Sequence, residues 1–141
     1  NQIPKNKDGS ISLFAQARAI EVNITDEYLA MGMRDGSLRV FQVAYKAPFW
    51  QEIAVYKCEH KKIKGEWIED LKFSPDSRYL IVGSHNNYLY LFEVPNFDKP
   101  VSVFGKSSSF IQHIDWSLDS SNVRTNDASY ELLYYSIPDG K

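Results

Sequence analysis

Three stretches of this chain follow one pattern in the same order, and they align with one another without gaps. They cover residues 20–41, 71–92 and 114–135. Each runs from alternating apolar residues through a polar turn, a short apolar run and a second polar turn to a final aromatic residue. A period of roughly 40–50 residues with short strands inside each unit is the signature of propeller blades. Such a unit buries its faces only against its neighbours, so function is expected on the assembled surface.

The alternation inside each unit predicts antiparallel strands joined by tight turns, and no segment has helical periodicity over ten or more positions. The sequence therefore predicts an all-β fold, a partial β-propeller of about three four-stranded antiparallel WD-type blades. A sandwich of antiparallel strands is the alternative, but its strands need not resemble one another as these do. The predicted parts are an arm at 1–16 with one possible strand at 11–14, and blades at 17–56, 68–104 and 110–141, the last without its outer strand.

Burial is expected to repeat along the first, innermost strand of each unit, where apolar and polar residues alternate. The side chains predicted to be buried are Ile20, Val22, Leu71, Phe73, Ile114 and Trp116. Because the third unit stops before a fourth strand, we interpret the chain as a piece of a longer protein. The open blade edges of the isolated fragment are expected to cause self-association, since unpaired strands and uncovered faces recruit partners.

The composition excludes several classes of function. Apolar residues make up 43% of the chain and the net charge is −2, so no overall electrostatic case exists for binding nucleic acid. No stretch approaches the ~20 apolar residues that a membrane helix needs, and no signal peptide is visible. The single cysteine, Cys58, excludes an internal disulfide and fits a reducing compartment, so a cytoplasmic location is expected.

Three phrases carry a more specific resemblance. Residues 70–85 read DLKFSPDSRYLIVGSH and are followed by NNYLYLF, residues 105–117 read GKSSSFIQHIDWS, and residues 130–135 read YELLYY. The first phrase looks like a WD repeat, and together the three resemble the repeats of the echinoderm microtubule-associated-protein-like family. The resemblance covers about residues 17–141. It implies a propeller that acts as a scaffold on tubulin or the microtubule, and a cytoskeletal location.

In the general WD pattern a His before the first strand, an Asp in the turn between the second and third strands, and a Trp on the third strand form a buried polar set. The resemblance places that set here in a degraded form, so the blades are expected to be held mainly by apolar packing. The His position reads His60 in the second unit and Lys106 in the third. The turn position reads Asp35, Asn86 and Ser129, and the Trp position reads Phe41, Phe92 and Tyr135. Lys106 is thus expected to face a unit whose carboxylate is gone.

No constellation of catalytic or metal-binding residues is found in the sequence. The three histidines, His60, His85 and His113, have no metal-ligand spacing with Cys58 or with one another. No glycine loop for phosphate binding is present, and Ser84 lacks a nucleophile elbow. The sequence therefore predicts no enzyme, no cofactor and no metal.

Two surfaces are candidates for partner binding. The loop at 57–64 holds Lys57, Lys61, Lys62 and Lys64 against one Glu, and its position between units places it at a propeller rim, where an acidic partner would be favoured. A merely solvated loop is the alternative. The excursion at 45–50 carries Phe49 and Trp50, which form either an exposed contact site or packing between blades.

The favoured function is a non-catalytic scaffold of a cytoskeletal protein that binds microtubules or tubulin. The alternative is a generic WD-repeat adaptor for another protein complex, with no cytoskeletal role. An enzyme that uses the propeller channel has no supporting residues. Neither nucleic acid nor a membrane is expected as a partner.

Overall fold

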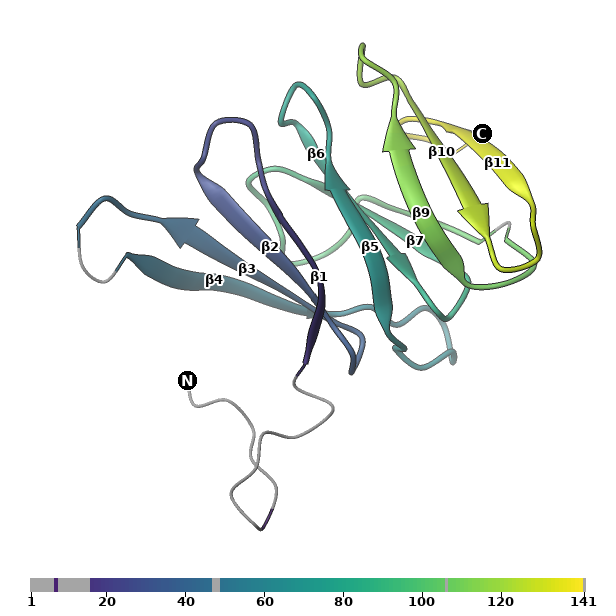
Figure 1. Ribbon diagram of the computed structural model, residues 1–141, viewed down its shortest axis with the longest axis horizontal. Coiled ribbons are helices and arrows are strands. Elements are labelled where there is room, and N and C mark those ends of the chain that lie inside the picture. Colours follow the sequence, from purple (N-terminus) through teal and green to yellow (C-terminus); the bar gives the residue numbers. More distant parts are fainter. Residues whose placement is uncertain (1–6, 8–15, 47–48, 106, 141) are drawn as a thin grey trace.

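The structure is a computed structural model that describes residues 7, 16–46, 49–105 and 107–140. Its strands form three antiparallel sheets of four, four and three strands, each folded as a meander, and the sheets stand side by side (Figure 1). This confirms the predicted all-β partial propeller, including a third blade of three strands. The possible strand at 11–14 lies outside the described residues. In the described part, no helix is long and apolar enough to cross a membrane.

The first blade contains β1 (Ala17–Val22), β2 (Tyr28–Met33), β3 (Ser37–Val43) and β4 (Trp50–Lys57). The second contains β5 (Ile68–Phe73), β6 (Tyr79–Ser84), β7 (Leu89–Glu93) and β8 (Ser102–Phe104), and the third contains β9 (Ile111–Trp116), β10 (Asn122–Asp127) and β11 (Leu132–Ser136). The first strands β1, β5 and β9 are neighbours, so they line the inner side of the arc.

The backbone conformation of the turns repeats from blade to blade. Each turn after a first strand has one residue with positive φ at the same repeat position, namely Asp26 (55°), Ser77 (58°) and Ser120 (60°). Each turn between the second and third strands has another, at Gly36 (83°), Asn87 (70°) and Tyr130 (64°). Few residues adopt positive φ without an energetic cost. Its recurrence at equivalent positions therefore confirms that the aligned sequence repeats are also repeats of the structure.

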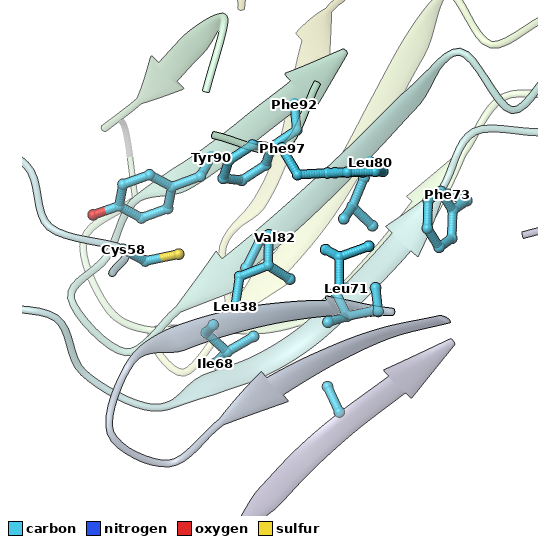
Figure 2. Packing of buried hydrophobic residues seen from close by; sticks show 13 residues of the cluster. Leu38, Cys58, Ile68, Leu71, Phe73, Leu80, Val82, Tyr90, Phe92 and Phe97 are labelled. Atoms are coloured by element: carbon cyan, nitrogen blue, oxygen red, sulfur yellow. The ribbon is translucent and has the colours of Figure 1, made fainter. Parts of the chain in front are cut away.

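Each blade has two faces, which we name by the chain direction. The leading face carries Ile20 in the first blade, Leu71 in the second and Ile114 in the third, and the trailing face points to the following blade. The leading face of the second blade packs on the trailing face of the first around Leu38, Leu71, Val82 and Phe92 (Figure 2). The leading face of the third blade packs on the second in the same way. Apolar burial at these two seams is the main source of stability.

Two glycines let neighbouring sheets approach closely. A Cβ placed on Gly32 of β2 would collide with Ile68, and one placed on Gly83 of β6 would lie 2.7 Å from Cγ2 of Ile111. Neither glycine has positive φ, so the requirement here is space for the branched side chain of the following blade. The third blade has Asn126 at this repeat position.

Burial along the first strands follows the prediction at three of its six positions. Leu71, Phe73 and Ile114 are buried, and Trp116 is half-buried with its indole N–H donating to the carbonyl oxygen of Lys72 (3.1 Å). The prediction was wrong for Ile20 and Val22, which are 64% and 41% exposed. Both belong to the leading face of the first blade, and no described blade covers that face.

Candidate interaction surface

The turn between β6 and β7 fixes the base of the basic loop, residues 57–64. Buried Asn86 donates from Nδ2 to the carbonyl oxygens of Cys58 (3.0 Å) and Lys64 (3.3 Å) and to the hydroxyl of Tyr90 (2.8 Å). The resemblance implied a hydrogen bond from His60 to this turn, but the His60 ring lies against the ring of Tyr88, 4.9 Å between centroids. Asn86 therefore fastens both ends of the loop without the histidine.

Two backbone hydrogen bonds close the turn at the tip of the basic loop. His60 and Ile63 exchange backbone N–H···O bonds of 3.3 and 3.0 Å, and Lys61 takes the left-handed conformation, φ 56°. Lys61, Lys62 and Lys64 are exposed. With its ends and its turn both hydrogen-bonded, the loop presents these ammonium groups from a defined backbone.

Lys57 differs from the other lysines of the basic loop because it is engaged within the first blade. Its Nζ donates to the carbonyl oxygen of Asp35 and lies 3.7 Å from the Asp35 carboxylate. Burial would raise the pKa of Asp35, but hydrogen bonds from the side chain and backbone of Ser37, together with Lys57, lower it. Asp35 thus stabilises its own turn and pairs with a lysine instead of a histidine.

The third blade keeps a buried carboxylate, which corrects the idea that this unit had lost it. Asp127, two residues before exposed Ser129, is 2% exposed. Its oxygens accept from the Ser107 hydroxyl (2.7 Å) and from the backbone N–H groups of Ser109, Ser129 and Glu131 (3.3, 2.9 and 3.0 Å). Lys106 lies outside the described residues.

The residues at the former Trp position are packed to different degrees. Phe92 and Tyr135 are buried in the two seams, whereas Phe41 is half-buried on the leading face of the first blade. Trp50 pairs with Val43 across β3 and β4, is 50% exposed, and neighbours Phe49, which is 57% exposed. Phe49 and Trp50 thus lie on the surface of the first blade.

A second set of cations, which the sequence analysis did not single out, lies beside the basic loop. Arg34 follows β2, and its guanidinium carbon lies 4.2 Å from the ring centroid of Trp67, just before β5. Arg18 of β1 lies 4.9 Å from the same ring. The turn of Arg34 touches the end of the loop, since a Cβ on Gly36 would lie 2.7 Å from the backbone of Gly65.

This stacking repeats between the next two blades. His85 follows β6, as Arg34 follows β2, and it stacks on Phe110 with 4.1 Å between centroids and 13° between planes. Backbone bonds repeat with it: Arg34 N–H donates to the carbonyl of Gln16 (2.8 Å) and His85 N–H to that of Trp67 (2.7 Å). The gap-free alignment places Arg34 with His85, and its extension by four residues upstream places Trp67 with Phe110, so the signal was present in the sequence.

Glu69 connects these groups across the seam between the first two blades. It accepts from Arg18 Nε (2.6 Å) and from a terminal nitrogen of Arg18 (2.9 Å), and Nε2 of His85 lies 2.7 Å from its Oε2. The hydrogen bonds from Arg18 are the main reason that the pKa of Glu69 lies below its usual range. Glu69 therefore neutralises Arg18, whereas Arg34 has no carboxylate partner among the described residues.

The exposed side chains of these surfaces are of the kinds that bind other macromolecules. In the described ranges, no group of three or more His, Cys, Asp or Glu residues could hold a metal ion. Cys58 is buried, and burial raises the pKa of its thiol strongly, so it is not a nucleophile. The exposed groups are ammonium, guanidinium and aromatic side chains, which recognise other macromolecules by charge and contact.

Comparison with protein families places this architecture. A family model described as the echinoderm microtubule-associated protein second beta-propeller matches residues 4–141. The chain belongs to this family. The family resemblance noted in the sequence is thereby confirmed.

Individual relatives show the same relationship over about half of the chain. Human echinoderm microtubule-associated protein-like 2 is 48% identical over 73 residues, which is 50% of this chain and 11% of the relative. Echinoderm microtubule-associated protein-like 4 of Xenopus laevis is 40% identical over 78 residues, 53% of this chain and 8% of the relative. The 77 kDa echinoderm microtubule-associated protein of Strongylocentrotus purpuratus is 43% identical over 68 residues, 46% of this chain and 10% of the relative. The matched segment thus spans about a tenth of each relative.

Proposed function

We propose that this chain is a non-catalytic scaffold module that binds tubulin or the microtubule. The observation that carries the proposal is its membership of a propeller family whose relatives are named microtubule-associated proteins. A cytoplasmic, cytoskeletal location follows from the same proposal. The basic loop, with its fastened backbone and its exposed Lys61, Lys62 and Lys64, is the proposed contact for an acidic partner, and exposed Phe49 and Trp50 are a second proposed contact.

Co-sedimentation with microtubules at several salt concentrations tests this function. We expect the chain to enter the pellet at low salt and to leave it as salt rises, because contacts between exposed charges are screened. A variant with Lys61, Lys62 and Lys64 all changed to Gln should sediment less, and its deficit should shrink at high salt. A triple variant on the opposite rim, with Lys46, Arg78 and Lys99 all changed to Gln, removes the same number of charges and is the matched control. A chain that stays in the supernatant at every salt concentration would refute the proposal.

The alternative function is a generic WD-repeat adaptor for another protein complex. The observation in its favour is that the packed seams and the repeated turns build a propeller scaffold that does not itself select one partner. An adaptor of this kind should stay in the supernatant with microtubules while retaining a protein partner in pull-down experiments.

We further propose that the isolated chain self-associates through its open faces. The leading face of the first blade exposes Ile20, Val22, Trp50 and Val55, whereas Leu71, Phe73 and Ile114, the counterparts of Ile20 and Val22 in the following blades, are buried against a neighbour. Edge strand β11 lacks an outer partner among the described strands. Exposed apolar faces and open edges are both removed by association.

A further inference from the structure

The two rims of the arc differ in charge. One rim, which we name the basic rim, carries Arg18, Arg34 and the basic loop, together with Trp67. The opposite rim holds the turns after the first strands, along the upper edge of Figure 1, and the loops after the third strands. Its exposed carboxylates include Asp26, Glu27, Asp76, Asp98 and Asp119. The basic rim also holds exposed Glu59 and Glu66, and the opposite rim also holds exposed Lys46, Arg78 and Lys99, so the excess of positive charge is local to Arg34 and the lysines of the basic loop. A partner segment that carries negative charge is attracted to that part of the basic rim.

On the basic rim, Arg34 differs from Arg18 and Lys57 because it has no carboxylate partner among the described residues. The guanidinium of Arg18 forms an ion pair with Glu69, and the ammonium of Lys57 forms one with Asp35. The guanidinium carbon of Arg34 lies over the Trp67 ring, 4.2 Å from its centroid, which restricts the position of the guanidinium. A guanidinium held in this way presents its fork of N–H donors to a carboxylate at a small entropic cost.

The turn of Arg34 and the basic loop are in contact on the same rim. The turn of Arg34 lies against Gly65, which directly follows Lys64, and Asn86 ties Lys64 and Cys58 to the second blade. Lys61, Lys62 and Lys64 thus extend from the Arg34–Trp67 stack along the same rim. An extended chain with carboxylates at intervals can meet the guanidinium and the ammonium groups in turn.

We propose that the basic rim is a docking site for an extended Glu- or Asp-rich peptide segment, with Arg34 as its bidentate carboxylate anchor and Lys61, Lys62 and Lys64 as its flanking contacts. The inference rests on the proposed scaffold function and names the partner chemistry and the surface. A single-stranded nucleic acid fits less well, because it needs free aromatic faces for base stacking. Here Trp67 is covered by Arg18 and Arg34, and Phe110 by His85.

Fluorescence anisotropy with a labelled, short glutamate-rich peptide tests the inference at low ionic strength. We expect Arg34→Gln to weaken binding by about tenfold or more, because a charge-assisted bidentate contact is lost. Arg78→Gln is the matched control, since Arg78 also lies over an aromatic ring, Tyr79 at 5.5 Å, but on the opposite rim. It should change the affinity by less than about twofold. Equal losses in the two variants would show only a net-charge effect and overturn the proposal.

Two further variants separate anchoring from folding. Arg34→Lys keeps the charge and loses the fork, so we expect weakened binding, and full affinity would overturn the bidentate anchor. The triple Gln variant of Lys61, Lys62 and Lys64 changes only exposed side chains, so it should fold normally and bind less tightly. Unchanged affinity of that variant at low salt would also overturn the proposal, as would tighter binding of an oligothymidine of the same charge.

The outcome is separable from that of the microtubule experiment. Peptide binding that depends on Arg34, without any co-sedimentation, would refute the microtubule proposal and support this one. Co-sedimentation that Arg34→Gln leaves unchanged, without peptide binding, would do the reverse.

Discussion

Ile20 and Leu71 occupy the same position in two successive repeats, yet Ile20 is 64% exposed and Leu71 is 2% exposed. Val22 and Phe73 form a second such pair, at 41% and 7%. The strands that carry them have the same length, the same alternation and equivalent turns. A repeat by itself encodes its strand register and its turns. Burial of its leading face, in contrast, requires a neighbouring blade.

The largest expected effect contrasts Phe73 with Val22. Phe73→Ala should lower the free energy of unfolding by about 3–5 kcal/mol, because it leaves a cavity between two packed sheets. Val22→Ala removes a side chain with little buried area and should cost less than about 1 kcal/mol. Urea denaturation followed by tryptophan fluorescence measures both. Similar losses at the two positions would mean that the leading face of the first blade is covered in solution.

A smaller effect is expected at the seam glycines. In Gly83→Ala the new Cβ would lie 2.7 Å from Cγ2 of Ile111 and 3.1 Å from Cδ1 of Ile114, so the sheets must shift. We expect a loss of about 1–3 kcal/mol in the same denaturation experiment. Asn126→Ala, at the equivalent position of the third blade, should change stability by no more than about 0.5 kcal/mol. A neutral Gly83→Ala would show that close approach is not required.

The pH dependence of stability should reveal the ion pair that crosses the seam. The hydrogen bonds from Arg18 lower the pKa of Glu69 in the folded state. Its contribution is therefore present above the unfolded-state pKa, near 4.3, and is lost as the pH falls through the lower folded-state value. Because Arg18 is partly exposed, we expect this contribution to be about 0.5–1 kcal/mol.

The difference between the wild-type chain and Glu69→Gln isolates this term. Other carboxylates with lowered pKa, including Asp35 and Asp127, titrate in the same acidic range in both proteins and cancel in the difference. Thermal unfolding measured from neutral pH downward should show the two stabilities converging as the pH falls. A gap that is constant over that range would contradict the assignment.

The smallest effect on stability is expected at Ile20. Ile20→Ser should leave the free energy of unfolding within about 0.5 kcal/mol, because the side chain is exposed in the monomer. Self-association should decrease in light scattering, since the apolar leading face is interrupted. Leu118→Ser, which changes a side chain that is 95% exposed on the turn after β9, is the control. A wild-type chain that remains a monomer at high concentration would refute self-association.

The blades could be predicted from the sequence because their determinants are local. Alternation of apolar residues and turn chemistry act within a few residues, and the positive φ at Ser77 and Asn87 recurs in the other repeats. Exposure of Ile20 could not be read from alternation, because it depends on a face that lies outside its own strand. The hydrogen bond from the Trp116 indole to the carbonyl oxygen of Lys72 likewise involves the neighbouring blade, so alternation within one strand does not predict it.

The candidate site was predictable only in part. The basic loop stands out by composition, but its fastening by Asn86 in place of His60 depends on which backbone carbonyls the turn reaches. The stack of Arg34 on Trp67 joins residues 33 positions apart and lacks a local motif. Comparing equivalent positions of the repeats would have found it, because His85 and Phe110 form the corresponding pair.

The glycine at the seam also governs spacing. Gly32 and Gly83 allow the following blade to approach more closely than a residue with a side chain would. The third blade has Asn126 at this position, which does not allow the same close approach. A blade or partner that packs on the trailing face of the third blade must leave room for the Asn126 side chain, or place a smaller residue against it. Similar sequence repeats can therefore hold their neighbours at unequal distances.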